Sequence, residues 1–330
     1  MWIKNADFLQ TVKLNWFLPC TERVLYRMVV KLKRLNQHLE WWNRDVFGNV
    51  FDNVRKLESN AAEAELVFYR DSSASNRSGL SLAKSKRALG FSMEEAFWKQ
   101  KAACKWAAEG ERNTKLFHNM VNRRRSNNKI YRIWENGIAL ENYLEIQESG
   151  AKYFETLLHG EDTVLNKPDW SCIPSLITTE ENDHLLGDIS EQELFECIKS
   201  LNAYSAAGPD GFSAGFFQNC WDIIKMDLLE AVREFLLGAP IPRAFTATTI
   251  VLIPKELVNQ INVKARGGNI ILKLDMAKAY DRVRWDFLAD ILRALGFSAG
   301  VCDMFMRCVS NCWFSVVFMG FHILLMRMIS

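Results

Sequence analysis

Residues 269–288 read NIILKLDMAKAYDRVRWDFL, and the order of apolar and charged positions in this stretch decides which fold we predict. Side chains alternate between the two faces of a strand, so Ile270, Leu272 and Leu274 share one face while Asp275 lies on the other, at the carboxyl end. On the residues alone, an aspartate at a strand end is more often a helix cap than a metal ligand.

A helix is predicted after this aspartate. From Asp281 to Leu295 the apolar residues fall at helical spacing, and Gly296 is suited to end the helix. The stretch therefore predicts a strand, an acidic corner and a helix.

The composition indicates a folded chain. Its 330 residues are 49% hydrophobic and 24% charged, which is enough to bury a core in about two domains. The 41 basic and 39 acidic residues leave a net charge of +2, so any attraction to polyanions must come from local clusters.

Cysteine spacing and the first residues bear on location. The eight cysteines contain no CxxC pair, and no His/Cys cluster has the spacing of zinc ligands. We therefore expect reduced thiols and an intracellular protein, nuclear or cytoplasmic. The first ten residues, MWIKNADFLQ, lack the basic and apolar regions of a secretory signal, so secretion is not expected.

One long apolar run, WFSVVFMGFHILLMRMI, occupies residues 313–329 and includes His322 and Arg327. Its 17 residues are short for a membrane span, which needs about 20. We predict a buried strand and its continuation, without a membrane partner; a C-terminal tail anchor is the alternative.

A long amphipathic helix is predicted at 25–46, because apolar residues recur there at alternating steps of three and four. Gly48 interrupts the spacing, which resumes at 50–64. We expect a helical bundle that buries this stripe, with an intermolecular coiled coil as the alternative. The Ser/Gly-rich stretch 71–81, DSSASNRSGLS, predicts a loop or linker. The apolar positions of the first helix are Leu25, Met28, Leu32, Leu35, Leu39, Trp42 and Val46.

A basic segment follows at 99–132, where ten Lys or Arg residues stand against two acidic ones, Glu109 and Glu111. Aromatic residues are interleaved with these cations. Cations that neutralise phosphates release counterions, and aromatic rings stack on unpaired bases, so the segment suits RNA or DNA. The alternative is a solvated basic face whose aromatic residues pack inward. The candidate nucleic-acid contacts are Lys99, Lys101, Lys105, Arg112, Lys115, Arg123, Arg124, Arg125, Lys129 and Arg132.

Four blocks occur in the order found in plant LINE-type (non-LTR) retrotransposon proteins, and the chain resembles that family along nearly its whole length. Residues 94–130 resemble the segment between endonuclease and polymerase. The other blocks are AYSAAGPDGFSAGFFQNCW at 203–221, TTIVLIPK at 248–255, and LKLDMAKAYDRVRWDFL followed by ALGF.

Two of these blocks also predict local structure. Pro209, Asp210 and Gly211 suit a tight turn before the amphipathic stretch 212–235, which in the family belongs to the fingers of the polymerase. A purely structural turn is the alternative, and the residues favour it. The β-branched block at 248–255 predicts a strand that stops at the proline.

The resemblance implies a reverse-transcriptase palm. By it, Asp275 is a catalytic ligand for two Mg²⁺ ions, Tyr280 is the steric gate that excludes a ribose 2′-hydroxyl, and Lys255 contacts the nucleotide triphosphate. Two-metal phosphoryl transfer needs several carboxylates.

The sequence departs from the family in two ways. It contains no Asp-Asp pair, and the residues after Lys255 run straight to Asp275 without the family's Arg-Pro-Ile-Ser segment, whose arginine contacts the triphosphate. The acidic residues that follow Asp275 are Asp281, Asp286, Asp290 and Asp303, the first three of them in the predicted helix. We therefore expect a chain truncated at both ends and deleted inside, with Mg²⁺ and triphosphate binding impaired.

The expected architecture is α+β: a mostly helical N-terminal half followed by an incomplete fingers and palm fragment. The expected domains are a basic helical region at 1–160, partial fingers at 161–255 and a partial palm at 256–330. Three functions follow: an RNA-directed DNA polymerase relative that is inactive alone, a non-catalytic RNA- or DNA-binding remnant that uses 99–132, or a degenerate reading frame without selected function.

Overall fold

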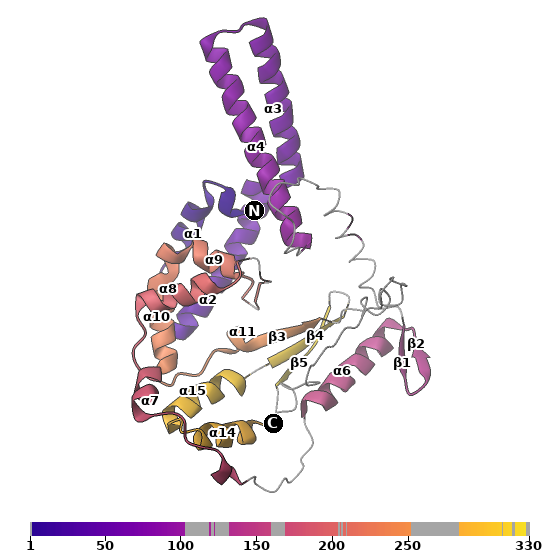
Figure 1. Cartoon of the computed structure of the whole chain (residues 1–330). Helices are drawn as coiled ribbons and strands as arrows, with labels where there is room; N and C mark the ends of the chain where they lie inside the picture. Colours follow the sequence, from indigo (N-terminus) through magenta and orange to yellow (C-terminus); the bar gives the residue numbers. More distant parts are fainter. Residues whose placement is uncertain are drawn as a thin grey trace, which may run out of the picture.

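The structure is a computed structural model that describes residues 2–102, 119, 122, 132–159, 169–203, 205, 207–208, 210–251, 284–311, 313–318 and 321–327. These residues form an α+β fold in which helices predominate and two small sheets are present. The predicted strand at 270–274 lies outside the described residues. Figure 1 shows a helical body, a long helical hairpin that projects from it, and a three-stranded sheet beside further helices.

The helical body begins with four elements: a short 3₁₀ turn η1 (Trp2–Lys4), α1 (Phe8–Trp16), α2 (Val24–Trp42) and a π-helical turn η2 (Asn43–Phe47). All six apolar stripe positions within α2 are buried, which confirms the predicted amphipathic helix. Val46 is the exception, because it is 55% exposed while Phe47 is buried. The π-helical turn closes i→i+5 hydrogen bonds, such as that from the N–H of Gly48 to the carbonyl of Asn43, and thereby shifts the residues after it around the helix axis and places Phe47 in the core.

Gly48 ends this turn with a φ of +71°, a conformation that favours glycine, so the predicted interruption is confirmed. The Asn49 side chain accepts a hydrogen bond from the backbone N–H of Phe51 and caps α3 (Val50–Arg70). Helix α3 packs along α4 (Ala74–Ala102), and together they form the projecting hairpin.

The loop predicted at 71–81 is wrong beyond its first three residues, because α4 already begins at Ala74. Ser and Gly disfavour helices in isolation, but contact with α3 half-buries Leu80 and Ala83 and outweighs that preference. The connection shortens to residues 71–73, where the Asp71 carboxylate and carbonyl both accept hydrogen bonds from Asn76 Nδ2.

The α2 stripe is buried mainly against residues far along the chain. Helix α2 packs on α10 (Trp221–Leu236), and α9 (Ala214–Asn219) leads into α10. The short helices α7 (Thr179–Leu185) and α8 (Glu191–Ser200) precede them. One core cluster joins both parts; among its members are Trp16, Leu35, Leu39, Phe212, Phe216 and Ile224. The stripe is therefore buried within this chain, as in the predicted bundle, but its partner comes from residues 212–231.

The predicted tight turn is present in front of α9. The N–H of Gly211 donates to the carbonyl of Gly208 at 3.0 Å, and Gly211 has a φ of +84°. The Asp210 carboxylate accepts from the N–H of Phe212 at 3.2 Å. The turn fixes Phe212 at the entrance to the core; Pro209 lies outside the described residues.

The two sheets are small. Strands β1 (Ile133–Glu135) and β2 (Ile138–Leu140) form a hairpin around Asn136 and Gly137, both with positive φ, as a type I′ turn requires. Strand β3 (Ala247–Val251) pairs in parallel with β4 (Trp313–Phe318), and β4 pairs antiparallel with β5 (Phe321–Arg327). The predicted strand in TTIVLIPK is confirmed for residues 248–251.

The C-terminal apolar run forms two strands, β4 and β5, that pair antiparallel. The predicted strand is present; the burial predicted for the run lies outside what the structure describes. Within the part of the chain that the structure describes, no helix has the length and apolar character needed to cross a membrane. Helix α6 (Tyr143–His159) contacts both of these strands.

Contacts of two arginines link α11 (Arg243–Thr246) to the sheet and α15 (Ala299–Val309) to the end of α10. The Arg243 guanidinium, in α11, lies 3.8 Å from the ring centre of Trp313. From α15, Arg307 donates to the carbonyls of Phe235 and Ala239. Helix α14 (Trp285–Ala294) precedes α15. Gly296, with a φ of +100°, follows the end of α14, as predicted. The 3₁₀ turn η3 (Trp170–Cys172) packs on α14.

Candidate nucleic-acid interface

The residues assigned to the palm site, Asp275, Tyr280 and Lys255, all lie outside the described residues. The same is true of seven candidate nucleic-acid contacts: Lys105, Arg112, Lys115, Arg123, Arg124, Arg125 and Lys129. Lys99 and Lys101 belong to the last turn of α4, whose backbone is described. The described part of this predicted interface is therefore limited to its two ends.

At the far end, Arg132 precedes β1 and forms an ion pair with Glu141. Both side chains are more than half exposed, so the pair contributes little to stability. A phosphate can compete with Glu141 for this arginine at small cost.

Four further cations lie on α4, and the sequence reasoning missed them because it treated residues 71–81 as a loop. No acidic residue occurs between Asp71 and Glu94. Of these cations only Arg87 is half-buried, and the other three are exposed. Helix α4 thus places positive charge on the hairpin just before the basic segment. The four residues are Arg77, Lys84, Lys86 and Arg87.

Helix α3 has mixed charge: four acidic residues stand against Arg55, Lys56 and Arg70, which are also exposed. Glu58, Glu63 and Glu65 are exposed on it, and Glu65 forms an ion pair with Lys84 of α4 at 3.3 Å. The charged residues between 58 and 65 of α3 are therefore all acidic, and those between 77 and 87 of α4 are all basic.

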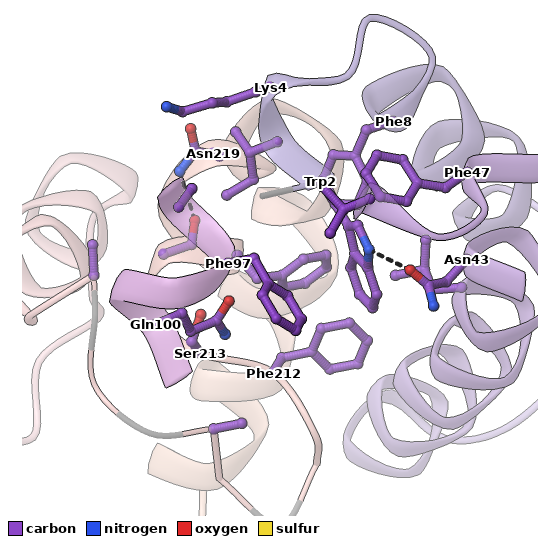
Figure 2. A pocket seen from close by; sticks show the side chains of 18 of the residues that line it. Trp2, Lys4, Phe8, Asn43, Phe47, Phe97, Gln100, Phe212, Ser213 and Asn219 are labelled. Atoms are coloured by element: carbon purple, nitrogen blue, oxygen red, sulfur yellow. Dashed lines mark hydrogen bonds between the residues drawn. The ribbon is translucent and has the colours of Figure 1, made fainter. Parts of the chain in front are cut away.

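A cavity of about 1290 Å³ lies where α4 meets the body. Its walls come from the N-terminal residues, the junction of α2 and α3, the end of α4 and the turn before α9. Figure 2 shows the rings of Trp2, Phe97 and Phe212 turned toward this space. Trp2 Nε1 donates to Asn43 Oδ1 at 2.8 Å, and the Phe97 ring meets the Phe51 ring edge-on, with centroids 5.5 Å apart. These contacts hold the aromatic walls in place.

Polar groups surround the cavity. Lys4 Nζ donates to Ser92 Oγ at 2.5 Å and thereby joins the N-terminal turn to α4. Arg44 also lines the space, and the neighbouring Asp45 raises the pKa of its guanidinium by a hydrogen bond and by its charge. Among the lining residues Glu95 is the one carboxylate. The cavity is therefore aromatic inside, with two cations and one anion around it.

Burial raises the pKa of the Asp210 carboxyl, and the hydrogen bond from the backbone of Phe212 opposes this shift. The side chain is used within the turn that places Phe212. This is consistent with the structural interpretation of the turn.

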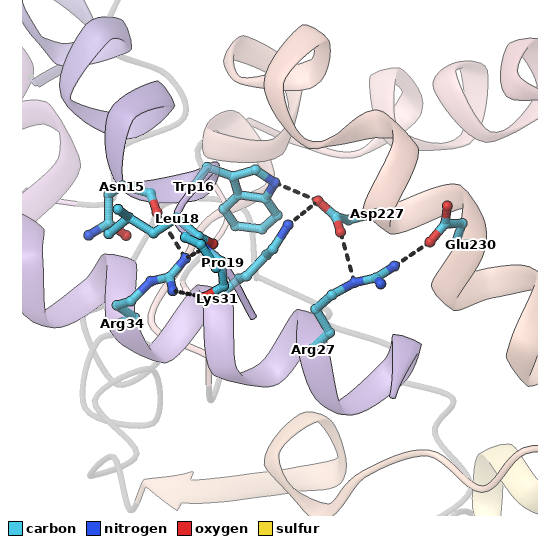
Figure 3. A network of polar contacts seen from close by, with 9 residues as sticks. All are labelled: Asn15, Trp16, Leu18, Pro19, Arg27, Lys31, Arg34, Asp227 and Glu230. Carbon is cyan, nitrogen blue, oxygen red and sulfur yellow. Dashed lines mark hydrogen bonds and ion pairs between the residues drawn. The ribbon is translucent and has the colours of Figure 1, made fainter. Parts of the chain in front are cut away.

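A polar network holds α10 against α1 and α2 (Figure 3). The Asp227 carboxylate accepts hydrogen bonds from Trp16 Nε1 at 2.8 Å and from Lys31 Nζ at 2.7 Å. Arg27 Nε lies 3.1 Å from its other oxygen, and Arg27 also pairs with Glu230. Three donors from two helices surround this carboxylate, which is largely buried. The network is structural and fixes the helix that follows the cavity wall.

Arg34 donates hydrogen bonds to backbone carbonyls at the end of α1 and just after it. Its guanidinium donates to the carbonyls of Asn15 at 2.9 Å, Leu18 at 3.2 Å and Pro19 at 3.3 Å. A cation at a helix C-terminus also complements the helix dipole.

The described aspartates do not assemble a magnesium site. Asp286 bonds to Arg284, which lowers the pKa of its carboxyl, and Asp290 and Asp303 pair with Arg293 and Arg307, each at 2.8 Å. Nowhere in the described ranges do three or more His, Cys, Asp or Glu side chains gather as metal ligands would. These residues therefore do not fit the two-metal centre that the resemblance implies.

The described residues define an α+β protein with a charged helical hairpin and an aromatic cavity at its base. A comparison of the chain with models of known protein families finds no match.

Proposed function

We propose that this chain is a non-catalytic nucleic-acid-binding protein related to the reverse transcriptases of LINE-type retroelements. The observation that carries the proposal is the composition of residues 99–132, with ten Lys or Arg and two acidic residues in a chain of net charge +2. Such a local excess attracts a phosphate backbone where the whole-molecule charge cannot.

The position of the segment supports this function. It begins in the last turn of α4, a helix whose preceding cations, from Arg77 to Arg87, have no acidic residue among them. It ends at Arg132, whose exposed pairing with Glu141 is readily exchanged for a phosphate. A second cluster of positive charge therefore lies on α4, separated from 99–132 by Glu94 and Glu95.

Polymerase activity is not part of the proposal. The resemblance provides one catalytic carboxylate, Asp275, and the sequence has no Asp-Asp pair to complete a two-metal site. The described aspartates that follow it are paired with arginines. We expect no Mg²⁺-dependent primer extension by this chain alone.

The test is the salt dependence of binding to a single-stranded oligonucleotide. Replacing Arg123, Arg124 and Arg125 with alanine should weaken binding and reduce the slope of log K against log salt by roughly 0.7 for each phosphate that is no longer neutralised. Fluorescence anisotropy over a salt series measures both quantities.

The matched control removes three exposed cations elsewhere, with Lys13, Lys33 and Lys152 replaced by alanine. It changes the net charge equally and should leave the slope as it is in the native chain. An unchanged slope in the arginine variant, or an equal reduction in both variants, would mean that 99–132 is a solvated face.

A further inference from the structure

We propose that the aromatic cavity at the base of the hairpin binds unpaired bases of the strand whose phosphates the basic segment holds. The inference rests on the proposed function and adds to it a second, uncharged mode of recognition. Its ligand class is a planar heteroaromatic ring carried on a single-stranded polyanion.

Size and shape are consistent with this ligand. Small-molecule pockets span roughly 300–1,000 Å³, and the cavity of about 1290 Å³ exceeds that range. It can therefore admit more than one base without displacing its walls.

The walls provide stacking surfaces. Trp2 and Phe97 present rings to the cavity from different segments, and Phe212 closes it from the turn before α9 (Figure 2). Stacking on such rings tolerates every base, because each base has a π-face. The rings are positioned by edge-on contacts and by the Trp2 to Asn43 hydrogen bond, so they are ordered before a ligand arrives.

Polar groups that could meet the edges of a base are available. The Asn43 side-chain oxygen accepts the hydrogen bond from Trp2, and the side-chain amide of Asn43 is a donor. Ser213 precedes α9 but makes no capping hydrogen bond. Gln100 is exposed on the cavity lining. These groups offer both donors and acceptors, which permits binding without a fixed sequence.

Chain continuity brings the two modes together. Gln100 lines the cavity and stands between Lys99 and Lys101, the first two cations of the basic segment. Lys4, bonded to Ser92 on the adjoining turns of α4, adds a further positive charge. A strand held at the start of the segment therefore has its bases within reach of the cavity.

The test compares two strands of about twelve nucleotides, one with bases and one abasic throughout. The native chain should bind the strand with bases roughly ten-fold more tightly at the same salt concentration, since each stacked base adds a contribution that an abasic sugar lacks. Equal binding of both strands would overturn the cavity inference and leave the proposed function standing. Failure to bind either strand would overturn both.

Variants then assign the preference to the cavity. Phe97→Leu keeps apolar volume but removes a stacking ring, and Gln100→Ala removes an exposed amide; both should reduce the preference for bases while binding of the abasic strand is retained. Tyr69→Leu, which removes an 88% exposed ring near the far end of α3, is the matched control and should change neither strand. If Phe97→Leu and Gln100→Ala fold and still prefer the strand with bases as strongly as the native chain does, the inference is contradicted.

Cross-linking gives a readout that does not depend on these variants. A strand carrying 5-iodouridine, irradiated in complex with the native chain, should attach to peptides that contain Trp2, Phe97 or Phe212. Attachment found by mass spectrometry only in peptides without cavity residues would refute the assignment.

Discussion

At the scale of single residues, Asp227 shows how one carboxylate can hold distant segments together. It accepts from Trp16 and Lys31 and faces Arg27, and the Lys31 and Asp227 side chains are only 10% and 14% exposed. Removing one partner of a buried pair is more costly than replacing the whole pair, because the remaining charge is left without compensation.

We therefore expect Asp227→Ala to lower the free energy of unfolding by about 3 kcal/mol, since it leaves Lys31 and the Trp16 indole unpaired. Glu230→Ala is the control: its side chain is 48% exposed, and the decrease should stay below about 1 kcal/mol. Urea titrations followed by circular dichroism measure both. Equal midpoints for the two variants would show that Asp227 is no more important than a surface residue.

Cys220 gives a prediction for pH. The thiol is buried in the core, and burial raises its pKa from 9.0 to about 12. The folded protein therefore holds this proton more tightly than the unfolded chain does, so the contribution to stability is complete below pH 9 and is lost as the pH rises toward 12.

Urea midpoints measured between about pH 8 and pH 11 check this loss of stability, and the burial behind it is checked by thiol alkylation near pH 8, read by mass spectrometry. The exposed thiols of Cys172 and Cys197 should react in the native protein, whereas Cys220 should react only after denaturant is added. Rapid labelling of Cys220 in the native protein would mean that α9 and α10 are not packed as described.

Residue-scale predictions from the sequence were accurate where the cause is local. Gly211 and Gly296 were expected in a turn and at a helix end, and both have the positive φ that those positions need. The role of Asp227 could not be predicted, because its partner Lys31 lies 196 residues away. Val46 was assigned to the buried stripe by a strict heptad, which fails where the helix takes up a π-helical turn.

At the scale of elements, the hairpin of α3 and α4 departs most from the sequence prediction. Helix α4 has a weak apolar stripe and a Ser-rich start, so periodicity alone favours a loop there. Its first half becomes helical because α3 supplies a surface to pack on.

Glycine substitutions test this helix. Gly79 lies inside α4 with open space around its Cα, so Gly79→Ala should increase the stability of the hairpin by about 0.5–1 kcal/mol. Gly238 follows α10, also with open space but with a φ of +106°, and Gly238→Ala should lower stability by about 1 kcal/mol.

Far-ultraviolet circular dichroism with thermal melting measures the pair. Because neither added methyl group meets a neighbour, the opposite signs depend only on backbone conformation. A destabilising Gly79→Ala would return residues 74–81 to the loop that the sequence predicts.

At the scale of the whole molecule, the core of the helical body joins residues between 8 and 50 to residues between 212 and 231. The stripe on α2 was predicted correctly, and so was the amphipathic segment that becomes α10. Their mutual packing could not be predicted, because periodicity indicates which face is buried but not which helix covers it. The candidate site was predicted from charge and resemblance; the cavity arises from segments that only the fold brings together.

Hydrogen exchange should report this shared core. Amides of α2 and α10 should exchange with similar, strong protection, because neither helix keeps its buried face when the other leaves. Amides in the far half of α3 and α4 should exchange faster, since each has only the other helix as support. Strong protection of α2 together with fast exchange of α10 would contradict the common core.

The division of charge within the hairpin has a consequence for how this molecule meets a polyanion. Between residues 58 and 65 of α3 the exposed charges are acidic, and between 77 and 87 of α4 they are basic, so this part of the hairpin has a transverse electric moment, although the net charge of the chain is only +2. The field of a nucleic acid exerts a torque on that moment, which turns this part of α4 toward the polyanion and this part of α3 away from it before any contact forms. The torque acts over about one Debye length, roughly 10 Å at 0.1 M salt, so salt governs the orientation of the encounter as well as its strength.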